Sequence, residues 1–311
     1  MRVNVDTFVR VETALQLDRI VAMAGGVNRW AHNRVPTPID QQNVIRMNRD
    51  TLYSFAVVDL SAGATVTLPD AAGRYLSVMA VNEDHHINRV FHDAGTHALT
   101  VEELGTEWVL LAARTLVDPE NADDVAVVHA LQDGLGVSAA ARRAWQHPEY
   151  DEASYTATRD AILALAAGVS DTHRMFGPRD AVDPVRHLLG TAAGWGGLPE
   201  TEAFYVLAAE PLPVGTYELT VRDVPVDGFW SISVYNRDGF FEANPDGSYS
   251  VNSVTATRSA DGSVTVHLAP TDTGEPNHLH VMDGWNYTVR LYRPRPAILD
   301  GSWTFPAPRA R

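Results

Sequence analysis

A strand-like pattern that ends in Asn-x-Asp occurs twice in this chain, once in each half. Residues 75–85 read Tyr-Leu-Ser-Val-Met-Ala-Val-Asn-Glu-Asp-His, and residues 229–239 read Phe-Trp-Ser-Ile-Ser-Val-Tyr-Asn-Arg-Asp-Gly. Each run has Ser at its third place and follows a Pro and a Gly. Aromatic and β-branched residues favour strands. The repeat therefore predicts two related β domains that pack together, and the polar ends of the two strands are where we expect a site.

The composition excludes several kinds of chemistry. The 311 residues are enough for about two domains, and 45% of them are apolar, so sizeable cores can form. The chain has no Cys and no Lys, since all 24 basic residues are Arg. Thiolate nucleophiles, disulfides and Cys-ligated metals are excluded, and so are Schiff bases and a phosphate-binding lysine.

The charge argues against polyanionic partners. The formal net charge is −15, whereas nucleic-acid binding needs a basic surface, and an anionic membrane surface would repel the chain in the same way. No apolar run approaches the roughly 20 residues of a membrane span. Residues 1–6 contain no apolar signal-peptide core. We expect a cytoplasmic protein that binds a small molecule and neither nucleic acid nor membrane.

Helix signals are concentrated at the N-terminus and in the middle of the chain. Apolar residues at helical spacing follow Asp6, a suitable cap, and Gly25-Gly26 ends the run. Asp118-Pro119-Glu120 predicts a second helix start, with Gly134 as its stop. Two further helices are predicted over 151–168 and 183–189, followed by a glycine-rich stretch at 190–197 that contains Trp195.

Strand signals occupy both ends of the chain. Short strands are predicted over 44–58, 65–68, 75–81, 98–101 and 108–112, and β patterning returns from Thr216. Asp261-Gly262 predicts a hairpin turn between alternating runs. Residues 285–292 alternate as well, which predicts a core face at Trp285, Tyr287, Val289 and Leu291. The opposite face, with Arg290, is expected to be solvated or to line a cavity.

Many stretches of the chain resemble a bacterial family with two tandem domains of unknown function, DUF1254 and DUF1214. The matching segments include Arg-Met-Asn-Arg-Asp-Thr-Leu-Tyr-Ser at 46–54, Val-Asn-Glu-Asp-His at 81–85, Asp-Gly-Phe-Trp-Ser-Ile-Ser-Val-Tyr-Asn at 227–236 and Gly-Trp-Asn-Tyr-Thr-Val-Arg-Leu-Tyr-Arg-Pro at 284–294. The resemblance implies a mainly β fold of two jelly-roll-like β-sandwich domains, joined by a helical segment and preceded by an N-terminal helix. It implies no reaction.

The predicted division has three parts. An N-terminal helix and β domain, similar to DUF1254, covers 1–117. A helical connection covers 118–198, and a β domain similar to DUF1214 covers 199–311. The chain departs from the family pattern at His86, where Tyr is more usual, and at Asn277-His278-Leu279-His280, which is richer in His.

The candidate catalytic residues come from two stretches. Glu83, Asp84 and His85 follow a predicted strand, and carboxylate with imidazole can exchange protons. Asp50 and Tyr53 lie in the family-like stretch at 46–54, where they can position a ligand by hydrogen bonds. The alternative for both stretches is a polar surface or a capped turn.

The candidate substrate-binding residues are polar or aromatic, as in many ligand pockets. They are Asn48, Trp195, Trp230, Tyr235, Asn236 and Arg290. The alternative for the aromatic members is an ordinary β core. Arg290 is suited to a carboxylate.

Two histidines raise the alternative of a metal. His278 and His280 are two residues apart and would share one face of a strand. A catalytic zinc site usually takes three protein ligands, and His85 or His86 is a candidate third. No cofactor is assigned by the sequence, and a divalent metal stays an alternative.

We expect a small-molecule enzyme that uses His and carboxylate groups for hydrolysis, elimination or isomerisation, in a cleft between or within the β domains. The first alternative is a binding protein that leaves its ligand unaltered. The second is a His-ligated, metal-dependent enzyme. A homo-oligomer is compatible with each of these.

Overall fold

The computed structural model describes residues 1–311 except 43, 44 and 209, and it divides into two compact units. The first unit contains Met1–Arg34 and Leu52–Glu200, and the second contains Val35–Thr51 and Thr201–Arg311. Residues 35–51 therefore make their contacts with the C-terminal part of the chain, although the sequence prediction puts them in the first domain. The predicted strand over 44–58 is observed only from Thr51, and Val44 lies outside the described residues.

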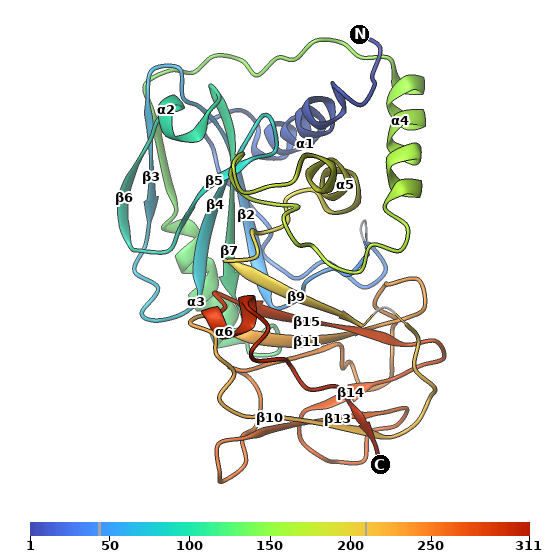
Figure 1. The fold of residues 1–311 in the computed structure, drawn as a ribbon. Helices are drawn as coiled ribbons and strands as arrows, with labels where there is room; N and C mark the ends of the chain where they lie inside the picture. The colour runs from blue at the N-terminus through green and yellow to red at the C-terminus, as the bar shows by residue number, and fades with distance from the viewer. Residues whose placement is uncertain (43–44, 209) are drawn as a thin grey trace. The chain divides into compact units, whose positions relative to one another are not determined.

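The first unit is a β sandwich of two antiparallel sheets (Figure 1). One sheet has the order β1-β2-β7-β4-β5 and the other has the order β6-β3-β8. The strands are β1 (Ala31–His32), β2 (Thr51–Asp59), β3 (Ala64–Leu68), β4 (Leu76–Asn82), β5 (Ile87–Phe91), β6 (Gly95–Leu99), β7 (Trp108–Leu116) and β8 (Gly136–Ala139). Alternate residues of β2, β3, β4 and β7 form one apolar core between the sheets.

The helices of the first unit are α1 (Phe8–Ala24), α2 (Val101–Leu104), α3 (Ala122–Asp133), α4 (Glu152–Leu165) and α5 (Pro184–Gly194). Among them α1, α4 and α5 pack on one another around Phe8, Ile162 and Leu189 (Figure 1). None of the helices in the described part of the chain is both long and apolar enough to span a membrane.

Two predicted helix starts are wrong by one to three residues. Helix α1 follows Thr7 rather than Asp6. Helix α3 begins after Asn121, not at Asp118, because the Asn121 side chain accepts hydrogen bonds from the free backbone N–H groups of Asp123 and Asp124 in its first turn. The helix predicted to end at Leu189 continues to Gly194. Glycine fits at position 190 because a β-carbon there would lie 2.8 Å from the Met175 side chain.

The second unit is also a sandwich, with sheet orders β12-β11-β15-β9 and β14-β13-β10-β16. Its elements are β9 (Ala203–Ala208), β10 (Tyr217–Val221), β11 (Trp230–Tyr235), β12 (Ser250–Asn252), β13 (Val264–Ala269), β14 (His278–His280), β15 (Asn286–Tyr292), α6 (Pro296–Leu299) and β16 (Arg309–Ala310). The pairings are antiparallel except for β13 with β14, which is parallel. The chain is thus mainly β with an N-terminal helix, as predicted.

Strand β15 has the predicted core face, but its other face is not solvated. Tyr287, Val289 and Leu291 pack in the core of the sandwich. On the opposite face, Asn286, Thr288 and Arg290 are buried as well. A buried polar face must satisfy its hydrogen-bonding groups by other means than bulk water, which makes this face the first place to look for a site.

The predicted hairpin at Asp261-Gly262 is only partly correct. A tight turn is present, with Gly262 at φ +83° and the backbone N–H of Ser259 bonded to Ser263 O. Strand β13 follows the turn, but the residues just before it form no strand. Strand β13 pairs with β10 and β14 instead.

Candidate functional site

The repeated Asn-x-Asp segments form the same turn in both units. Asn82 Oδ1 accepts hydrogen bonds from the backbone N–H groups two and four residues later, at 3.0 and 2.9 Å. Asn236 Oδ1 does the same at 3.1 and 3.0 Å. The third residue after each Asn is left-handed, with φ +60° at His85 and +85° at Gly239. The shared spacing therefore serves to end β4 and β11 by an Asn-bonded turn.

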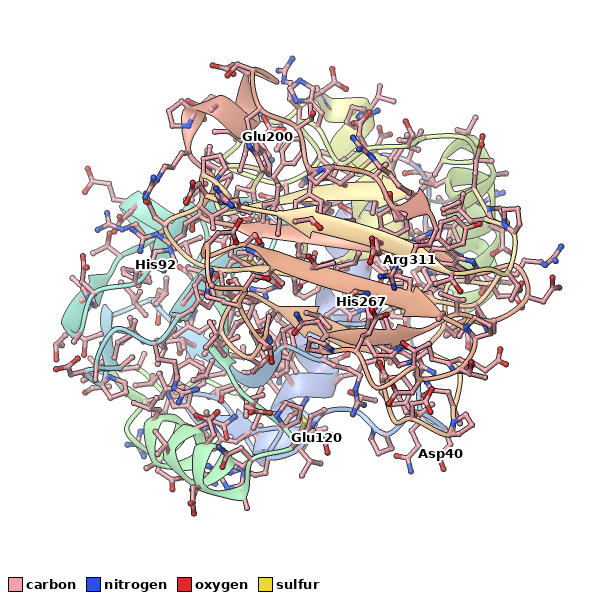
Figure 2. The ribbon with its side chains drawn as sticks, turned by 90° about the horizontal axis from the view of Figure 1, so that it is seen from below. Asp40, His92, Glu120, Glu200, His267 and Arg311 are labelled. Atoms are coloured by element: carbon pink, nitrogen blue, oxygen red, sulfur yellow. The ribbon has the colours of Figure 1, made fainter. Side chains whose placement is uncertain are left out.

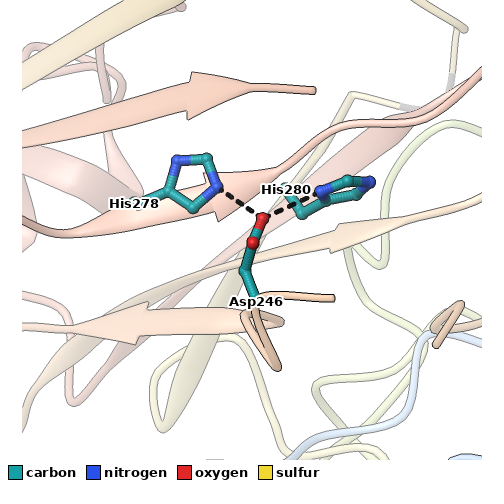
Figure 3. Close-up of side chains that lie close together, drawn as sticks. All are labelled: Asp246, His278 and His280. Carbon is teal, nitrogen blue, oxygen red and sulfur yellow. Dashed lines mark hydrogen bonds and ion pairs between the residues drawn. The ribbon is translucent and has the colours of Figure 1, made fainter. Parts of the chain in front are cut away.

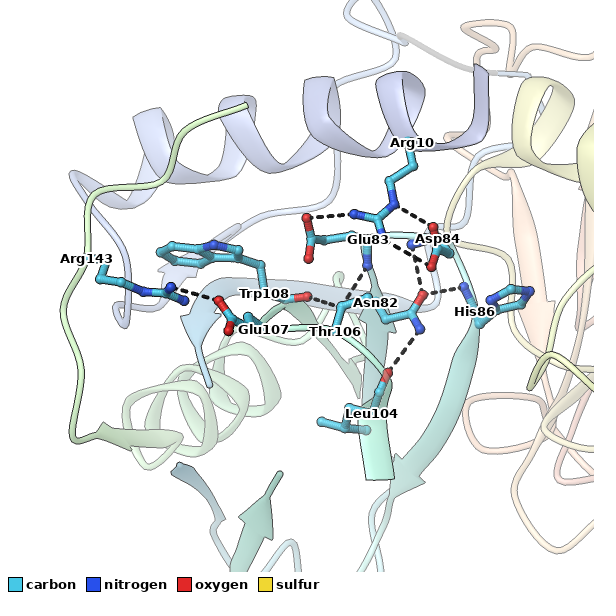
Figure 4. Close-up of polar contacts among 10 residues, drawn as sticks. All are labelled: Arg10, Asn82, Glu83, Asp84, His86, Leu104, Thr106, Glu107, Trp108 and Arg143. Atoms are coloured by element: carbon cyan, nitrogen blue, oxygen red, sulfur yellow. Dashed lines mark hydrogen bonds and ion pairs between the residues drawn. The ribbon is translucent and has the colours of Figure 1, made fainter. Parts of the chain in front are cut away.

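Glu83 and Asp84 are bound to helix α1 by one arginine (Figure 4). Arg10 Nε donates to Asp84 Oδ1 at 2.5 Å, and Arg10 Nη1 donates to Glu83 Oε1 at 3.1 Å. Burial raises the pKa of Glu83, against the effect of Arg10. Both carboxylates thus have a partner that ties the turn to α1.

His85 lies inside the first unit. Its side chain is fully buried, Nδ1 is 2.8 Å from Thr191 Oγ1, and Nε2 accepts a hydrogen bond from Gly196 N at 2.9 Å. The ring stacks on Trp195 at 5.1 Å between centroids. Burial, followed by the nearby His187, lowers the pKa of His85 well below its usual value. The two ring nitrogens thus bond Thr191 in α5 and Gly196 just after it, so both are occupied by protein groups and neither is open to a ligand.

His86 is half-buried and stacks on His187, with 4.7 Å between ring centroids. Burial and the neighbouring His187 lower the pKa of His86 to about 4. His86 is therefore neutral at physiological pH.

Four of the predicted residues meet within the second unit, although they come from separate stretches. They are Asn48, Asp50, Tyr235 and Arg290. Arg290 is buried on β15, where its Nη2 donates to Arg46 O at 2.6 Å and to Tyr235 OH at 2.8 Å. Burial alone would lower the pKa of Arg290, but Tyr235, Tyr292 and Asp50 raise it, so the guanidinium is a permanent charge. We call this group the Arg290 network.

Asp50 is the least satisfied member of the Arg290 network. Its side chain is almost entirely buried, at 2% exposure. Oδ1 accepts a hydrogen bond from Ser250 Oγ at 2.6 Å, while Oδ2 has no hydrogen-bond partner among the described residues. Ser231 Oγ and Asn286 Oδ1, on the polar faces of β11 and β15, also lack a partner within the described part of the chain. Unmet acceptors of this kind call for a bound water or a ligand.

The remaining candidates lie elsewhere. Tyr53 is in β2 of the first unit, under the guanidinium of Arg114 and stacked on Phe55. Trp195 donates to Thr13 Oγ1 at 3.1 Å. Trp230 packs in the core of the second unit, and Asn236 forms the turn described above.

Sequence reasoning missed two buried serines, one in each unit, that lie opposite an arginine on the neighbouring strand. Ser231 lies opposite Arg290 in the pairing of β11 with β15, and Ser77 lies opposite Arg114 in the pairing of β4 with β7. The Ser at the third place of the repeat was the available signal, and its partner Arg becomes visible only when the strands are paired.

A second cluster contains the two predicted metal candidates (Figure 3). Asp246 Oδ2 lies 3.2 Å from His278 Nε2 and 3.1 Å from His280 Nδ1. The hydrogen bond from His280, followed by the one from His278, lowers the pKa of Asp246. Asp246, which the sequence did not indicate, thus supplies a third group from within the second unit.

The fold and the Arg290 network define a protein of two β-sandwich units with a buried polar face in the second. Two family models match the chain: "Protein of unknown function (DUF1254)" over residues 27–95 and "Protein of unknown function (DUF1214)" over residues 212–296. The chain thus carries both domains in tandem, as predicted.

Two solved structures are similar over nearly the whole chain. The VPA0106 protein from Vibrio parahaemolyticus is 17% identical with a TM-score of 0.74, covering 99% of this chain and 100% of that one. A putative uncharacterized protein from Burkholderia cenocepacia is 14% identical with a TM-score of 0.55, covering 98% and 86%. At these identities the similarity is one of fold. No curated protein matches the chain significantly.

Proposed function

We propose that the second unit binds a small molecule at the Arg290 network and that the Asp50 carboxylate acts there as an acid–base group. The observation that carries the proposal is Asp50 Oδ2, a buried carboxylate oxygen with no hydrogen-bond partner among the described residues. Leaving such a group unbonded costs roughly 1–3 kcal/mol or more. A donor from a ligand would remove that cost.

The unmet groups suggest the chemistry of the ligand. A carboxylate and an amide oxygen, at Asp50 and Asn286, both accept hydrogen bonds, and the Ser231 hydroxyl can do either. A molecule with hydroxyl or amine groups would match them. Arg290 donates to backbone and side-chain oxygens of its own unit and so keeps this surface in place.

The reaction class follows from which groups are present. The chain has no Cys or Lys, so a proton transfer by Asp50 to or from a ligand hydroxyl, or a water beside it, is the step these residues support. Hydrolysis, elimination and isomerisation all use such a transfer. The proposal does not use Glu83, Asp84 and His85, because these side chains already bond Arg10, Thr191 and Gly196. Their catalytic role stays a sequence prediction.

The test uses a panel of polyols, sugars, hydroxy acids and amino alcohols, with thermal shift for binding and mass spectrometry for products. Asp50→Asn keeps the size of the side chain and removes the base. The matched control is Asp238→Asn, an exposed Asp of the same unit. We expect turnover of a compound from the panel to fall by about 10²- to 10⁴-fold in Asp50→Asn only.

The outcomes separate the proposal from its alternatives. A compound that binds the parent protein, loses affinity in Asp50→Asn and is recovered unaltered supports a binding protein without catalysis. Equal binding and equal turnover in Asp50→Asn and the parent would remove Asp50 from the site.

A further inference from the structure

We propose that Asp246, His278 and His280 bind one divalent transition-metal ion in the second unit. This site is separate from the Arg290 network and does not depend on it. It rests on three ligand groups that come from two segments of the chain and converge on one point (Figure 3).

The strand geometry presents the two imidazoles together. In β14, Leu279 points into the core, so His278 and His280 share the opposite face. The parallel pairing of β14 with β13 fixes this orientation, since Leu279 lies beside Leu268. The two rings are therefore set by the backbone of the sheet, as a binding site requires.

The third ligand is held by a loop that is tied to the same strand. Ser248 Oγ donates to His278 O at 2.5 Å, and Asn244 Oδ1 accepts from Ser248 N at 3.0 Å. Asp246 lies between Asn244 and Ser248 in the sequence, so these two bonds hold its carboxylate beside the two imidazoles.

The distances fit shared coordination. Nitrogen and oxygen ligands lie about 2.1 Å from a metal such as zinc, so two ligands are about 3.4 Å apart in a tetrahedral site and about 3.0 Å apart where they meet at right angles. The Asp246 oxygen is 3.2 and 3.1 Å from the two ring nitrogens. Hydrogen bonds span the same range of distances, so the binding measurement described below tests the assignment to a metal site.

The donor set indicates which ions fit. Two imidazoles and one carboxylate are typical ligands of zinc, iron, cobalt and nickel, and they leave positions open for water or a ligand oxygen. Magnesium and calcium prefer oxygen ligands alone. We expect zinc and cobalt to bind and magnesium not to compete.

A neighbouring cluster serves as a contrast. His267 lies beside His278 in the β13–β14 pairing, with Glu218 and Glu275 near its ring. A cavity of about 290 Å³ is lined in part by Glu218 and His267. Arg311 already bonds both carboxylates, at 2.9 and 2.8 Å, and lies on the same sheet face as His267 (Figure 2). Because the Arg311 guanidinium already pairs with both carboxylates and would be displaced or repelled by a cation there, we expect one bound metal per chain rather than two.

The experiment uses the full chain, prepared without a His tag and stripped with a chelator. Cobalt is added and followed by its visible absorption, and zinc binding is measured by equilibrium dialysis with excess magnesium present. We expect one equivalent in the parent protein, and at least a roughly 100-fold weaker affinity in His280→Ala and in Asp246→Asn. Asp246 lies in a loop, so the second variant keeps the test valid if the first is poorly folded.

The matched control is His173→Ala, which removes a surface imidazole bonded to Glu200 at 2.9 Å in the first unit. Its affinity should equal that of the parent protein. Failure of zinc and cobalt to bind, or equal affinity in His280→Ala and the parent, would overturn the proposal. Metal binding that is lost in His267→Ala but kept in His280→Ala and Asp246→Asn would also overturn it.

Discussion

Replacing His85 by Ala tests whether this residue serves the fold or the chemistry. His85 is fully buried in the first unit, at a left-handed backbone position with φ +60°. Its two ring nitrogens bond Thr191 and Gly196. If those contacts are its role, His85→Ala destabilises the protein. If His85 transfers protons, the variant folds normally and loses only activity.

The magnitude follows from the contacts. Two hydrogen bonds are worth about 1 kcal/mol each, and removing a buried ring that packs on Trp195 and Phe176 costs about 2 kcal/mol more. We therefore expect His85→Ala to lower the free energy of unfolding by about 4 kcal/mol.

A second variant makes the test more specific. The equivalent position in the other unit is Gly239, and a left-handed residue with a β-carbon is strained by roughly 1–2 kcal/mol. His85→Gly should therefore be roughly 1 kcal/mol more stable than His85→Ala, the reverse of the usual order for an ordered position.

The assay is urea unfolding followed by tryptophan fluorescence and circular dichroism, with His173→Ala as a surface control. Both probes are needed because two units need not unfold together. A His85→Ala midpoint equal to that of the control would refute the structural reading of His85.

Three further predictions follow from polar groups of the fold. The pKa of His86 is about 4 in the folded protein, below the 6.5 of the unfolded chain. The unfolded state therefore binds more protons between these values, and stability falls as pH drops from about 6.5 to about 4. Allowing for the half exposure of His86, we expect the free energy of unfolding to fall by about 1 kcal/mol, seen as a Tm decrease that is absent in His86→Asn. Asp59 is buried and accepts hydrogen bonds from Arg143; Asp59→Asn should cost about 2 kcal/mol in urea unfolding, and no change in the midpoint would contradict the assignment. Asn236→Ala removes two side-chain bonds to backbone N–H groups and should cost about 2 kcal/mol by the same measurement. Asn82→Ala removes two such bonds and a third, from Asn82 Nδ2 to Leu104 O, and should cost about 3 kcal/mol. A cost in only one of the two variants would show that the two turns are not equivalent.

The sequence predicts features that depend on local pattern. Strict alternation at 285–292 was enough to assign Val289 to the core. Asp151 and Asp183 cap α4 and α5 as their positions suggest, because a cap is a contact between near neighbours. At α3 the same rule predicted a start at Asp118, whereas the structure has the cap at Asn121, three residues later.

The candidate site depends on contacts that local pattern does not contain. His85 is a polar residue at a strand end, and its burial follows from partners 106 and 111 residues away. Asp50 meets Ser250 across 200 residues. Asp246 meets His278 from a loop 32 residues earlier. Residue types indicated the kind of chemistry in each case, but only the tertiary fold decides which groups meet.

The Ser–Arg pairs of the two units allow the fold and the function of the repeat to be separated. Ser77 beside Arg114 and Ser231 beside Arg290 occupy matching places on central strands. Both hydroxyls are fully buried and without a hydrogen-bond partner among the described residues. A buried hydroxyl of this kind does not stabilise a fold, so Ser77→Ala and Ser231→Ala should be neutral or stabilising by up to roughly 1 kcal/mol in urea unfolding.

In the second unit the Asp50 carboxylate lies near the Ser231–Arg290 pair, on the segment 35–51 that belongs to this unit. If the Arg290 network binds a ligand, Ser231→Ala weakens that binding about 3- to 10-fold, the loss of one hydrogen bond, while Ser77→Ala leaves it unchanged. A destabilisation of 2 kcal/mol or more in both variants would mean that the hydroxyls are satisfied in solution by bound water. The repeated Ser would then have a structural role only. The Ser231 hydroxyl would no longer support a ligand site beside Asp50.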